Sequence, residues 1–307
     1  MPSLTYGGCG APGVGRSASI LELTDNLTMR LAYLGFPHTG GTHTVYQFLR
    51  KGLERHGIEV RWVSANPRAD GVRNDPTWRH EADHGELPAV GMVTAKQRGV
   101  ALVNHIERAG YDGVFVNVLI NPIDMNSARY LSTDILKVGI VHNITIGTYK
   151  AVSGVRDYLH QSVGVSPRIS RDLVEKYNFD ASRTRCIYNA IDLAPYRDAP
   201  RSPRLGPLRL LSLGRIADDA KGVFWLPKIL RRLGAGVDVE LTVVGDGPDL
   251  AQLKLRCAEF GTRVRFIGRV DNAEVPGIAA DHDVFLMPSR YEGIGLTLIE
   301  MLSLIHI

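Results

Sequence analysis

The feature that most constrains the fold is an alternation of strand-like and helix-like runs, which begins at Met29 and restarts after residue 207. Amphipathic stretches separate most of the apolar runs, as between Val45 and Leu53, where apolar residues recur at helical spacing. The alternation favours an α/β fold with helices on both faces of a parallel sheet. In the first block the predicted strands are 30–35, 58–63, 112–118, 137–142, 161–166 and 185–188.

A proline-rich boundary divides the chain. Residues 192–207 contain prolines at 195, 200, 203 and 207, which the interior of a helix or a central strand does not tolerate. We therefore predict a linker between a first domain over 29–191 and a second over 208–307. The second contains predicted strands 208–213, 238–244, 263–267 and 283–287 and helices 221–233, 248–260 and 273–280. Two Rossmann-like halves leave a cleft between them, and such sheets bind ligands at the carboxyl ends of their strands.

Three segments depart from this rhythm. The polar segment 66–90 is predicted to be a long loop on the surface or over the cleft. Residues 1–28 are interpreted as a flexible leader or a mis-assigned start, with Met29 as the initiator. Within them, residues 10–17 come close to a phosphate-binding loop, but arginine replaces the lysine and no buried strand precedes it. Because residues 302–307 stop within a helical pattern, we expect the natural sequence to continue and the second domain to be incomplete.

Composition narrows the functional classes. No apolar run approaches the ~18–20 residues needed to cross a bilayer. The three cysteines have no metal-binding spacing, which favours a reducing cytoplasm. With 36 Lys+Arg against 32 Asp+Glu, the chain is mildly basic, as suits anionic ligands or an acidic membrane surface. Aromatic residues are not interleaved with a basic run, so nucleic acid is not an expected partner.

Two cations follow the first strand of the second domain. Gly214 lets the chain turn off strand 208–213. Arg215 and Lys221 then lie in a loop leading into a helix, whose N-terminus favours an anion. Arginine grips phosphate through two parallel hydrogen bonds and lysine supplies a point charge, so the pair suits a diphosphate. A solvated loop with two surface cations is the alternative interpretation.

The most informative segment follows strand 283–287. Gly293 and Gly295 lead into an apolar helix whose free amides can meet a negative group. Glu292 lies before this turn and Glu300 about two helical turns further on, so both carboxylates can contact one extended ligand. Carboxylates beside a phosphate site accept hydrogen bonds from sugar hydroxyls. The alternative is a capping role for Glu292 and a surface position for Glu300.

These segments together resemble one family. The block SRYEGIGLTLIE, with two glutamates separated by seven residues, resembles the signature of retaining glycosyltransferases of family 4. The run GRIADDAKG is similar to their Arg…Lys diphosphate clamp, and IYNAIDLAPY to the Asn-Gly-Val-Asp run before their linker. The resemblance extends from about Met29 to Leu302. Ala190 stands where the family usually has glycine, and Ile294 where it more often has phenylalanine.

The resemblance implies a fold and catalytic roles. The fold would be GT-B, with two Rossmann-like parallel-sheet domains facing a cleft. Arg215 and Lys221 would stabilise the departing diphosphate, Glu292 would hold donor-sugar hydroxyls, and His142 would contact the donor sugar. For His142, a strand-end histidine bonded to backbone is the alternative.

Donor binding is implied for further residues in both domains. Backbone amides of a glycine pair in the first domain would meet the donor's phosphate, and the second glutamate would hold the ribose. The implied donor-binding residues are Gly40, Gly41, Gly293, Ile294, Gly295, Leu296, Thr297 and Glu300.

The implied activity is a hexosyltransferase reaction. A sugar would pass from a nucleotide-diphosphate sugar to an unidentified acceptor (a sugar, a lipid-linked group or a small molecule) with retention of anomeric configuration. No covalent nucleophile is needed, because the leaving phosphate can take the acceptor's proton. The alternatives are a nucleotide-sugar hydrolase or epimerase of the same fold, an inactive fragment, and a nucleotide-binding protein that uses residues 10–17.

No metal or further cofactor is expected beside the donor. Asp281-His282-Asp283 looks like the Asp-x-Asp metal motif of the other large glycosyltransferase fold. Asp283, however, begins a strand, so we expect this run to cap a helix end. The expected location is cytoplasmic, with peripheral contact at the inner face of the membrane; the oligomeric state is left open.

Overall fold

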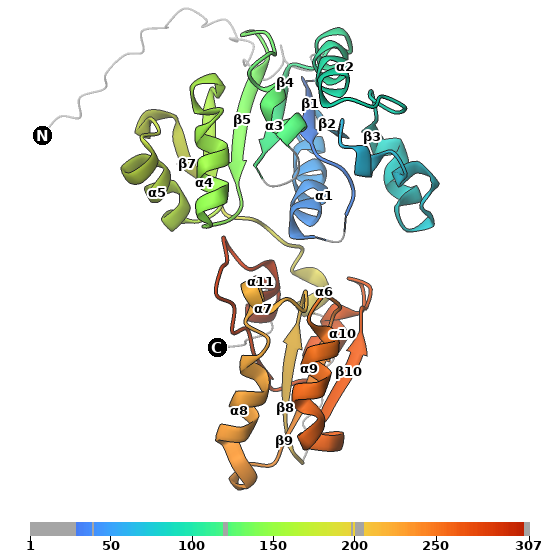
Figure 1. Ribbon diagram of the computed structural model, residues 1–307, viewed down its shortest axis with the longest axis vertical. Helices are drawn as coiled ribbons and strands as arrows, with labels where there is room; N and C mark the ends of the chain where they lie inside the picture. The colour runs from blue at the N-terminus through green and yellow to red at the C-terminus, as the bar shows by residue number, and fades with distance from the viewer. Residues whose placement is uncertain (1–28, 39, 119–121, 198, 200–205, 304–307) are drawn as a thin grey trace, which may run out of the picture.

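The computed structural model describes residues 29–38, 40–118, 122–197, 199 and 206–303. These residues form two α/β domains, each built on its own sheet, which lie one above the other in Figure 1. All strand pairs in both sheets are parallel, as the alternation of strands and helices predicts. The leader, with its phosphate-loop-like run at residues 10–17, lies outside the described residues.

The first domain contains a seven-stranded sheet in the order β3-β2-β1-β4-β5-β6-β7. Its strands are β1 Met29–Leu34, β2 Ile58–Val63, β3 Gly85–Glu86, β4 Gly113–Asn117, β5 Leu136–Val141, β6 Gln161–Gly164 and β7 Thr184–Cys186. Its α-helices are α1 Gly41–Glu54, α2 Ala95–Arg108, α3 Pro122–Ser127, α4 Ile146–Ser153 and α5 Pro167–Tyr177. Shorter 3-10 turns are η2 Pro67–Ala69, η3 Val72–Asn74, η4 Pro76–His84, η5 Arg156–Tyr158 and η6 Ala181–Arg183.

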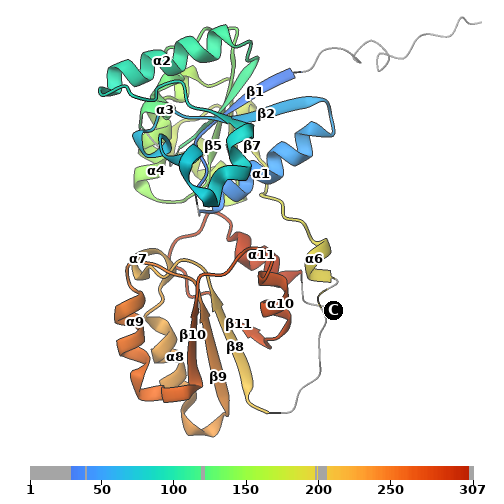
Figure 2. The same ribbon diagram turned by 90° about the vertical axis from the view of Figure 1, so that its right-hand side faces the viewer.

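The second domain contains a four-stranded sheet in the order β10-β9-β8-β11. Its strands are β8 Leu208–Leu213, β9 Val239–Val244, β10 Val264–Gly268 and β11 Val284–Phe285. Its helices are α7 Asp218–Lys221, α8 Trp225–Leu233, α9 Leu250–Cys257, α10 Val275–Ala280 and α11 Leu296–Leu302, with 3-10 turns η7 Gly234–Gly236 and η8 Ala258–Arg263. Figure 2 shows α8 and α9 on one side of this sheet and α10 and α11 on the other.

Local sequence explains where the helices begin and end. α2 starts at a capping box, in which the Thr94 hydroxyl accepts from the Gln97 amide and the Gln97 side chain bonds back to Thr94. α5 starts at Ser166 with proline directly after it, and Asn178 ends the helix in the left-handed conformation. The predicted helix 221–233 is divided into α7 and α8, because Gly222 adopts a left-handed φ of 61° between them.

Segment 66–90 differs from the predicted surface loop. It forms the 3-10 turns η2 to η4 and then β3, which pairs with β2 at the edge of the sheet. The side chains of Asn66 and Asp75 accept backbone N–H groups at the starts of η2 and η4. Buried Trp62 also donates its indole N–H to the Glu81 carbonyl, at 2.9 Å. The polar residues that suggested a loop therefore cap short helices.

The predicted linker contains a short helix, although its prolines suggested that no helix would form there. The four-residue helix α6, Ala194–Arg197, includes Pro195 in its first turn, where a missing backbone N–H costs no hydrogen bond. Its Tyr196 is buried in a cluster of apolar side chains with Leu211 on β8 and Met301 on α11. The segment after the first domain is thus anchored to the core of the second.

Candidate functional site

The loop after β8 packs closely against the loop after β9. A Cβ atom on Gly245 would lie 1.9 Å from the Gly214 carbonyl oxygen, and one on Gly247 would lie 2.2 Å from that of Ile216. The amide of Ile216 also donates to the Asp246 carbonyl at 2.9 Å. Only glycine fits at these close approaches. Arg215 therefore extends from a backbone held on both sides at the carboxyl end of the sheet.

The structure brings Lys221 and Glu292 together. The ammonium of Lys221, at the end of α7, forms an ion pair and hydrogen bond with the Glu292 carboxylate. The two loops also meet through backbone: the Arg290 amide donates to the Ala220 carbonyl at 2.8 Å. A Cβ on Gly222 would lie 2.2 Å from the Pro288 carbonyl oxygen, so glycine permits this approach as well. The predicted cation and carboxylate thus belong to one site.

Arg215 is the cation left available there. Its side chain is exposed and has no ion pair or hydrogen bond with another described residue. Arg290, by contrast, donates to the Asp218 carboxylate at 3.0 Å and is already compensated. An uncompensated guanidinium on the segment that leads into α7 provides positive charge for an anionic ligand.

The start of α11 supplies backbone donors. Gly295 is the N-cap of α11 and makes no side-chain capping hydrogen bond. Within the described residues, the amides of Leu296 and Thr297 have no acceptor, whereas those of Leu298 and Ile299 bond to the Gly295 carbonyl. Such free amides at a helix start attract negative charge.

Glu300 has a partner that the sequence analysis did not identify. The Tyr196 hydroxyl, on α6, is hydrogen-bonded to the Glu300 carboxylate. Burial raises the pKa of Glu300 and the bond from Tyr196 opposes that rise. Glu300 is therefore a partly buried carboxylate held by a partner and not a surface charge. The sequence contained one signal for this contact, because Tyr196 is an aromatic residue at the end of IYNAIDLAPY. The prediction of a linker over 192–207 gave this residue no role.

His142 is the first residue after β5, one position beyond the strand's end. Its Nε2 lies 3.0 Å from Oδ1 of Asn117, and the Asn117 side-chain amide donates to the Leu34 carbonyl at 3.1 Å. With that orientation Oδ1 accepts, so Nε2 carries the proton of His142. Burial lowers the pKa of His142 to about 4, which keeps the imidazole neutral at pH 7. Asn117, the residue that orients it, was not predicted.

The glycine pair divides into two roles. The Gly40 amide donates to Nδ1 of His38 at 2.8 Å, and Nε2 of His38 lies 2.8 Å from the Thr42 hydroxyl. The Gly40 amide, predicted to meet a phosphate, is therefore occupied by His38. Gly41 faces the other domain: a Cβ placed on it would lie 3.4 Å from the Leu296 side chain.

The two domains meet at the glutamate-containing loop. A Cβ on Gly293 would lie 1.9 Å from the His142 carbonyl oxygen, and 3.3 Å from the Val165 side chain. Ile294 packs against the apolar core of the first domain. Of the predicted residues, Gly41 and His142 in the first domain thus come next to Gly293 and Leu296 in the second.

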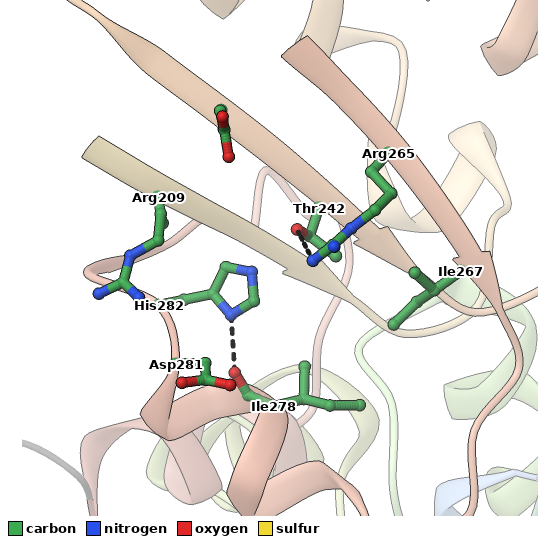
Figure 3. Close-up of a pocket in the computed structure, with 8 residues that line it drawn as sticks. Arg209, Thr242, Arg265, Ile267, Ile278, Asp281 and His282 are labelled. Carbon is green, nitrogen blue, oxygen red and sulfur yellow. Dashed lines mark hydrogen bonds between the residues drawn. The ribbon is translucent and has the colours of Figure 1, made fainter. Parts of the chain in front are cut away.

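A cavity elsewhere in the second domain is not part of this site. It has a volume of about 230 Å³ and lies on the sheet face beside α10, as Figure 3 shows. Its lining includes Arg209, Thr242, Arg265, Ile278 and His282. Arg209 is compensated by Asp283, whose carboxylate accepts from its side chain at 2.8 Å. The cavity thus offers no uncompensated charge from Arg209.

The Asp-x-Asp run has structural roles. The pKa of Asp283 is lowered by its hydrogen bonds with Arg209, so this carboxylate joins β8 to the start of β11. His282 caps α10 as expected, because its Nδ1 lies 2.6 Å from the Ile278 carbonyl oxygen. Within the described ranges, no group of three or more His, Cys, Asp or Glu side chains is arranged to hold a metal ion. Nor does any described helix have the length and apolarity to span a membrane.

Comparison with known proteins finds a family model that matches the second domain. The model of the family described as Glycosyl transferases group 1 matches residues 207–304, which contain Arg215, Lys221 and both glutamates. The second domain is thus similar to this family, and the two parallel-sheet domains together have the GT-B fold. The phosphatidyl-myo-inositol mannosyltransferase of Mycobacterium tuberculosis is 25% identical over 232 residues, which are 71% of this chain and 60% of that protein. The chain therefore spans less than two thirds of this relative.

Two further comparisons show the range of this GT-B homologue's relatives. The glycogen synthase of M. tuberculosis is 32% identical over 141 residues, 44% of this chain and 33% of that protein. The solved structure of Anabaena HepE in complex with UDP has a TM-score of 0.66 at 14% identity, covering 90% of this chain and 78% of that one. At that identity the structural likeness supports the GT-B fold alone.

Proposed function

We propose that this chain carries the donor site of a retaining glycosyltransferase that uses a nucleotide-diphosphate sugar. The observation that carries the proposal is the Lys221–Glu292 pair, which joins the loops after β8 and β11. Exposed Arg215 lies on the first of these loops, and the amides that begin α11 follow the second. Cations and free amides suit the two phosphates, and an adjacent carboxylate suits sugar hydroxyls. One relative is named as a mannosyltransferase and another as a glycogen synthase, and HepE was solved with UDP.

In the proposed reaction, the bond between the anomeric carbon and the diphosphate oxygen breaks, and the acceptor oxygen bonds to that carbon on the same face. The acceptor's proton passes to the leaving phosphate, so no side chain acts as nucleophile. Arg215, Lys221 and the amides of Leu296 and Thr297 stabilise the charge that develops on the diphosphate. Because these cations and amides offset the negative charge of the leaving diphosphate, the proposal includes no metal.

The remaining residues hold the donor's sugars. Glu292 accepts hydrogen bonds from donor-sugar hydroxyls, with Lys221 fixing its carboxylate. Glu300, held by Tyr196, accepts from the ribose. His142 acts as a neutral hydrogen-bonding group, since its pKa is lowered to about 4 and its Nε2 proton is held by Asn117. Its Nδ1 is then the acceptor for a donor-sugar hydroxyl.

The cytoplasm is the proposed compartment, in keeping with Cys186 and Cys257, which are both unpaired in the structure. Contact with the inner face of the membrane stays a prediction.

The proposal is tested by incubating the chain with UDP-, GDP- and ADP-sugars, with and without candidate acceptors, and following nucleoside diphosphate release. Proton NMR of the product then reports its anomeric configuration. We expect release that depends on acceptor, an unchanged anomer and no effect of a chelator. Release at the same rate without acceptor indicates a hydrolase, and an epimerised nucleotide sugar indicates an epimerase; either result contradicts the transferase proposal.

A further inference from the structure

A set of hydrogen bonds extends across three neighbouring strands on the first-domain side of the site. The strands β1, β4 and β5 are adjacent in the sheet. Tyr33 lies on β1, Asn117 ends β4 and His142 directly follows β5. The side chains of Tyr33 and Asn117 are almost fully buried, with 2% and 1% of each residue exposed. Their polar groups must therefore find partners within the protein.

The first half of this set joins His142 to Tyr33. Nε2 of His142 donates its proton to Oδ1 of Asn117, 3.0 Å away. The side-chain amide of Asn117 donates to the Leu34 carbonyl at 3.1 Å, and it also hydrogen-bonds to the Tyr33 hydroxyl. Because the Leu34 carbonyl can only accept, the orientation of the Asn117 amide is fixed.

The second half joins Tyr33 to the turn before α1. The Tyr33 hydroxyl donates to the Thr42 carbonyl at 2.8 Å. Burial raises the pKa of Tyr33, so this hydroxyl keeps its proton at neutral pH. The Thr42 hydroxyl lies 2.8 Å from Nε2 of His38, whose Nδ1 accepts the Gly40 amide at 2.8 Å. The hydrogen bonds therefore connect Gly40 with His142 without a gap.

Both ends of this set contact the second domain. At one end, a Cβ on Gly293 would lie 1.9 Å from the His142 carbonyl oxygen. At the other end, Gly41 lies within the turn that His38 holds, and a Cβ on it would lie 3.4 Å from the Leu296 side chain. Gly293 and Leu296 belong to the short segment that leads into α11. The buried hydrogen bonds thus fix the positions of these two contacts relative to each other.

We propose that Tyr33 is a positioning residue whose hydroxyl couples the turn at 40–42 to His142. The inference rests on the proposed function, in which His142 and the start of α11 meet the donor. Tyr33 does not touch the donor and acts through Thr42 and Asn117. A buried polar network whose members are satisfied is rigid, whereas removal of one hydroxyl lets its two halves move separately.

The first test removes the hydroxyl alone, in Tyr33→Phe. With a donor and acceptor that the natural chain turns over, we expect kcat to fall about fivefold, the scale of one hydrogen bond. The donor KM should stay unchanged, because the loops of the second domain still bind the donor. Tyr149→Phe is the matched control, since it removes another buried hydroxyl of the first domain, which bonds to Asp172 at 3.1 Å. Equal falls in both variants, or an unchanged kcat in Tyr33→Phe, would overturn the proposal.

A double-mutant cycle tests the coupling itself. His38→Ala and Asn117→Ala are measured singly and together, in the natural chain and in Tyr33→Phe. If the hydroxyl joins the two positions, the combined effect on kcat should differ from the product of the single effects by about threefold or more in the natural chain. In Tyr33→Phe the difference should disappear. Independent effects in the natural chain, or a difference that persists in Tyr33→Phe, would overturn the coupling.

Proton–nitrogen NMR of the histidine rings separates this inference from the proposed function, because it needs no donor. His38→Ala should shift the Nε2 resonance of His142 in the natural chain but not in Tyr33→Phe. That result in a chain that turns over no nucleotide sugar would overturn the proposed function and leave the coupling through Tyr33 in place. Turnover of a nucleotide sugar without the shift would overturn the coupling alone.

Discussion

A Cβ atom on Gly293 would lie 1.9 Å from the carbonyl oxygen of His142. The two residues belong to different domains, so the loop that carries Glu292 meets the first domain backbone to backbone. Neither partner in this contact is a side chain that can rotate away, and packed interiors do not absorb such an overlap without movement. Glycine at 293 therefore allows the backbone next to Glu292 to approach the backbone of His142.

The first prediction concerns this approach. Gly293→Ala should force the domains apart while leaving the donor loops of the second domain intact. We expect nucleotide binding to be retained but sugar transfer to fall about 100-fold, the scale associated with a displacement near 1 Å in a catalytic site. Steady-state kinetics and small-angle scattering measure the two effects. Gly277→Ala is the control, because a Cβ on this α10 glycine meets nothing within 4 Å. Unchanged transfer in Gly293→Ala contradicts the account.

The Lys221–Glu292 pair gives the second prediction. Lys221→Ala removes positive charge from the leaving diphosphate and leaves the Glu292 carboxylate without its partner. We expect the rate of nucleoside diphosphate release to fall on the order of 10²–10³, as when one preorganised donor is removed from a charge-stabilising site. Lys228→Ala serves as control, because this ammonium lies over the exposed Trp225 ring, 4.5 Å from its centroid. Equal losses in both variants would argue against a catalytic role for Lys221.

Tyr196 supplies the third prediction. Tyr196→Phe keeps the buried ring but deletes the hydroxyl that bonds to Glu300. A hydrogen bond of this kind contributes about 1 kcal/mol, so we expect donor affinity to fall about fivefold. The effect should disappear with a donor whose ribose lacks its hydroxyls. Tyr188→Phe, at an exposed position before the linker, provides the control for calorimetry. An affinity loss that persists with the modified ribose would point to a packing effect.

The half-buried His142 gives the fourth prediction, on stability and pH. The folded-state pKa of His142 is lowered from 6.5 to about 4, so between these values the unfolded chain binds more protons than the folded one. The free energy of unfolding should therefore fall as pH drops through this window, by up to ~1.4 kcal/mol per pH unit from this group. Urea unfolding at pH 7, 6 and 5 should give a smaller slope for His142→Gln than for the natural chain. The pKa of His38 is also lowered to about 4, so the His142→Gln variant should still lose some stability as the pH falls. Identical slopes would contradict a lowered pKa of His142 in the folded chain.

Much of the fold and part of the site followed from sequence pattern. Apolar runs fixed the main strands to within a few residues, because buried parallel strands are apolar on both faces. Since parallel strands end at one edge, the loops after β8 and β11 had to approach each other. The ion pair between Lys221 and Glu292 was not predicted, because each residue was given its own contact with the ligand.

What the sequence did not predict depends on contacts between distant residues. The orientation of His142 by Asn117 and the bond from Tyr196 to Glu300 join elements that no local periodicity connects. The occupation of the Gly40 amide by His38 depends on one side-chain rotamer. β3 was missed because a two-residue strand has no periodicity to detect.

The measurement that tests the central claim most directly is calorimetric binding of UDP-, GDP- and ADP-sugars to the natural chain and to Arg215→Ala. Arg232→Ala is the matched control, because Arg232 is an exposed arginine near the end of α8. We predict that one donor binds the natural chain and Arg232→Ala equally. Arg215→Ala should weaken that binding at least tenfold, about 1.4 kcal/mol. Binding that Arg215→Ala leaves unchanged, or no donor binding by a chain shown to be folded, would contradict the donor site described here.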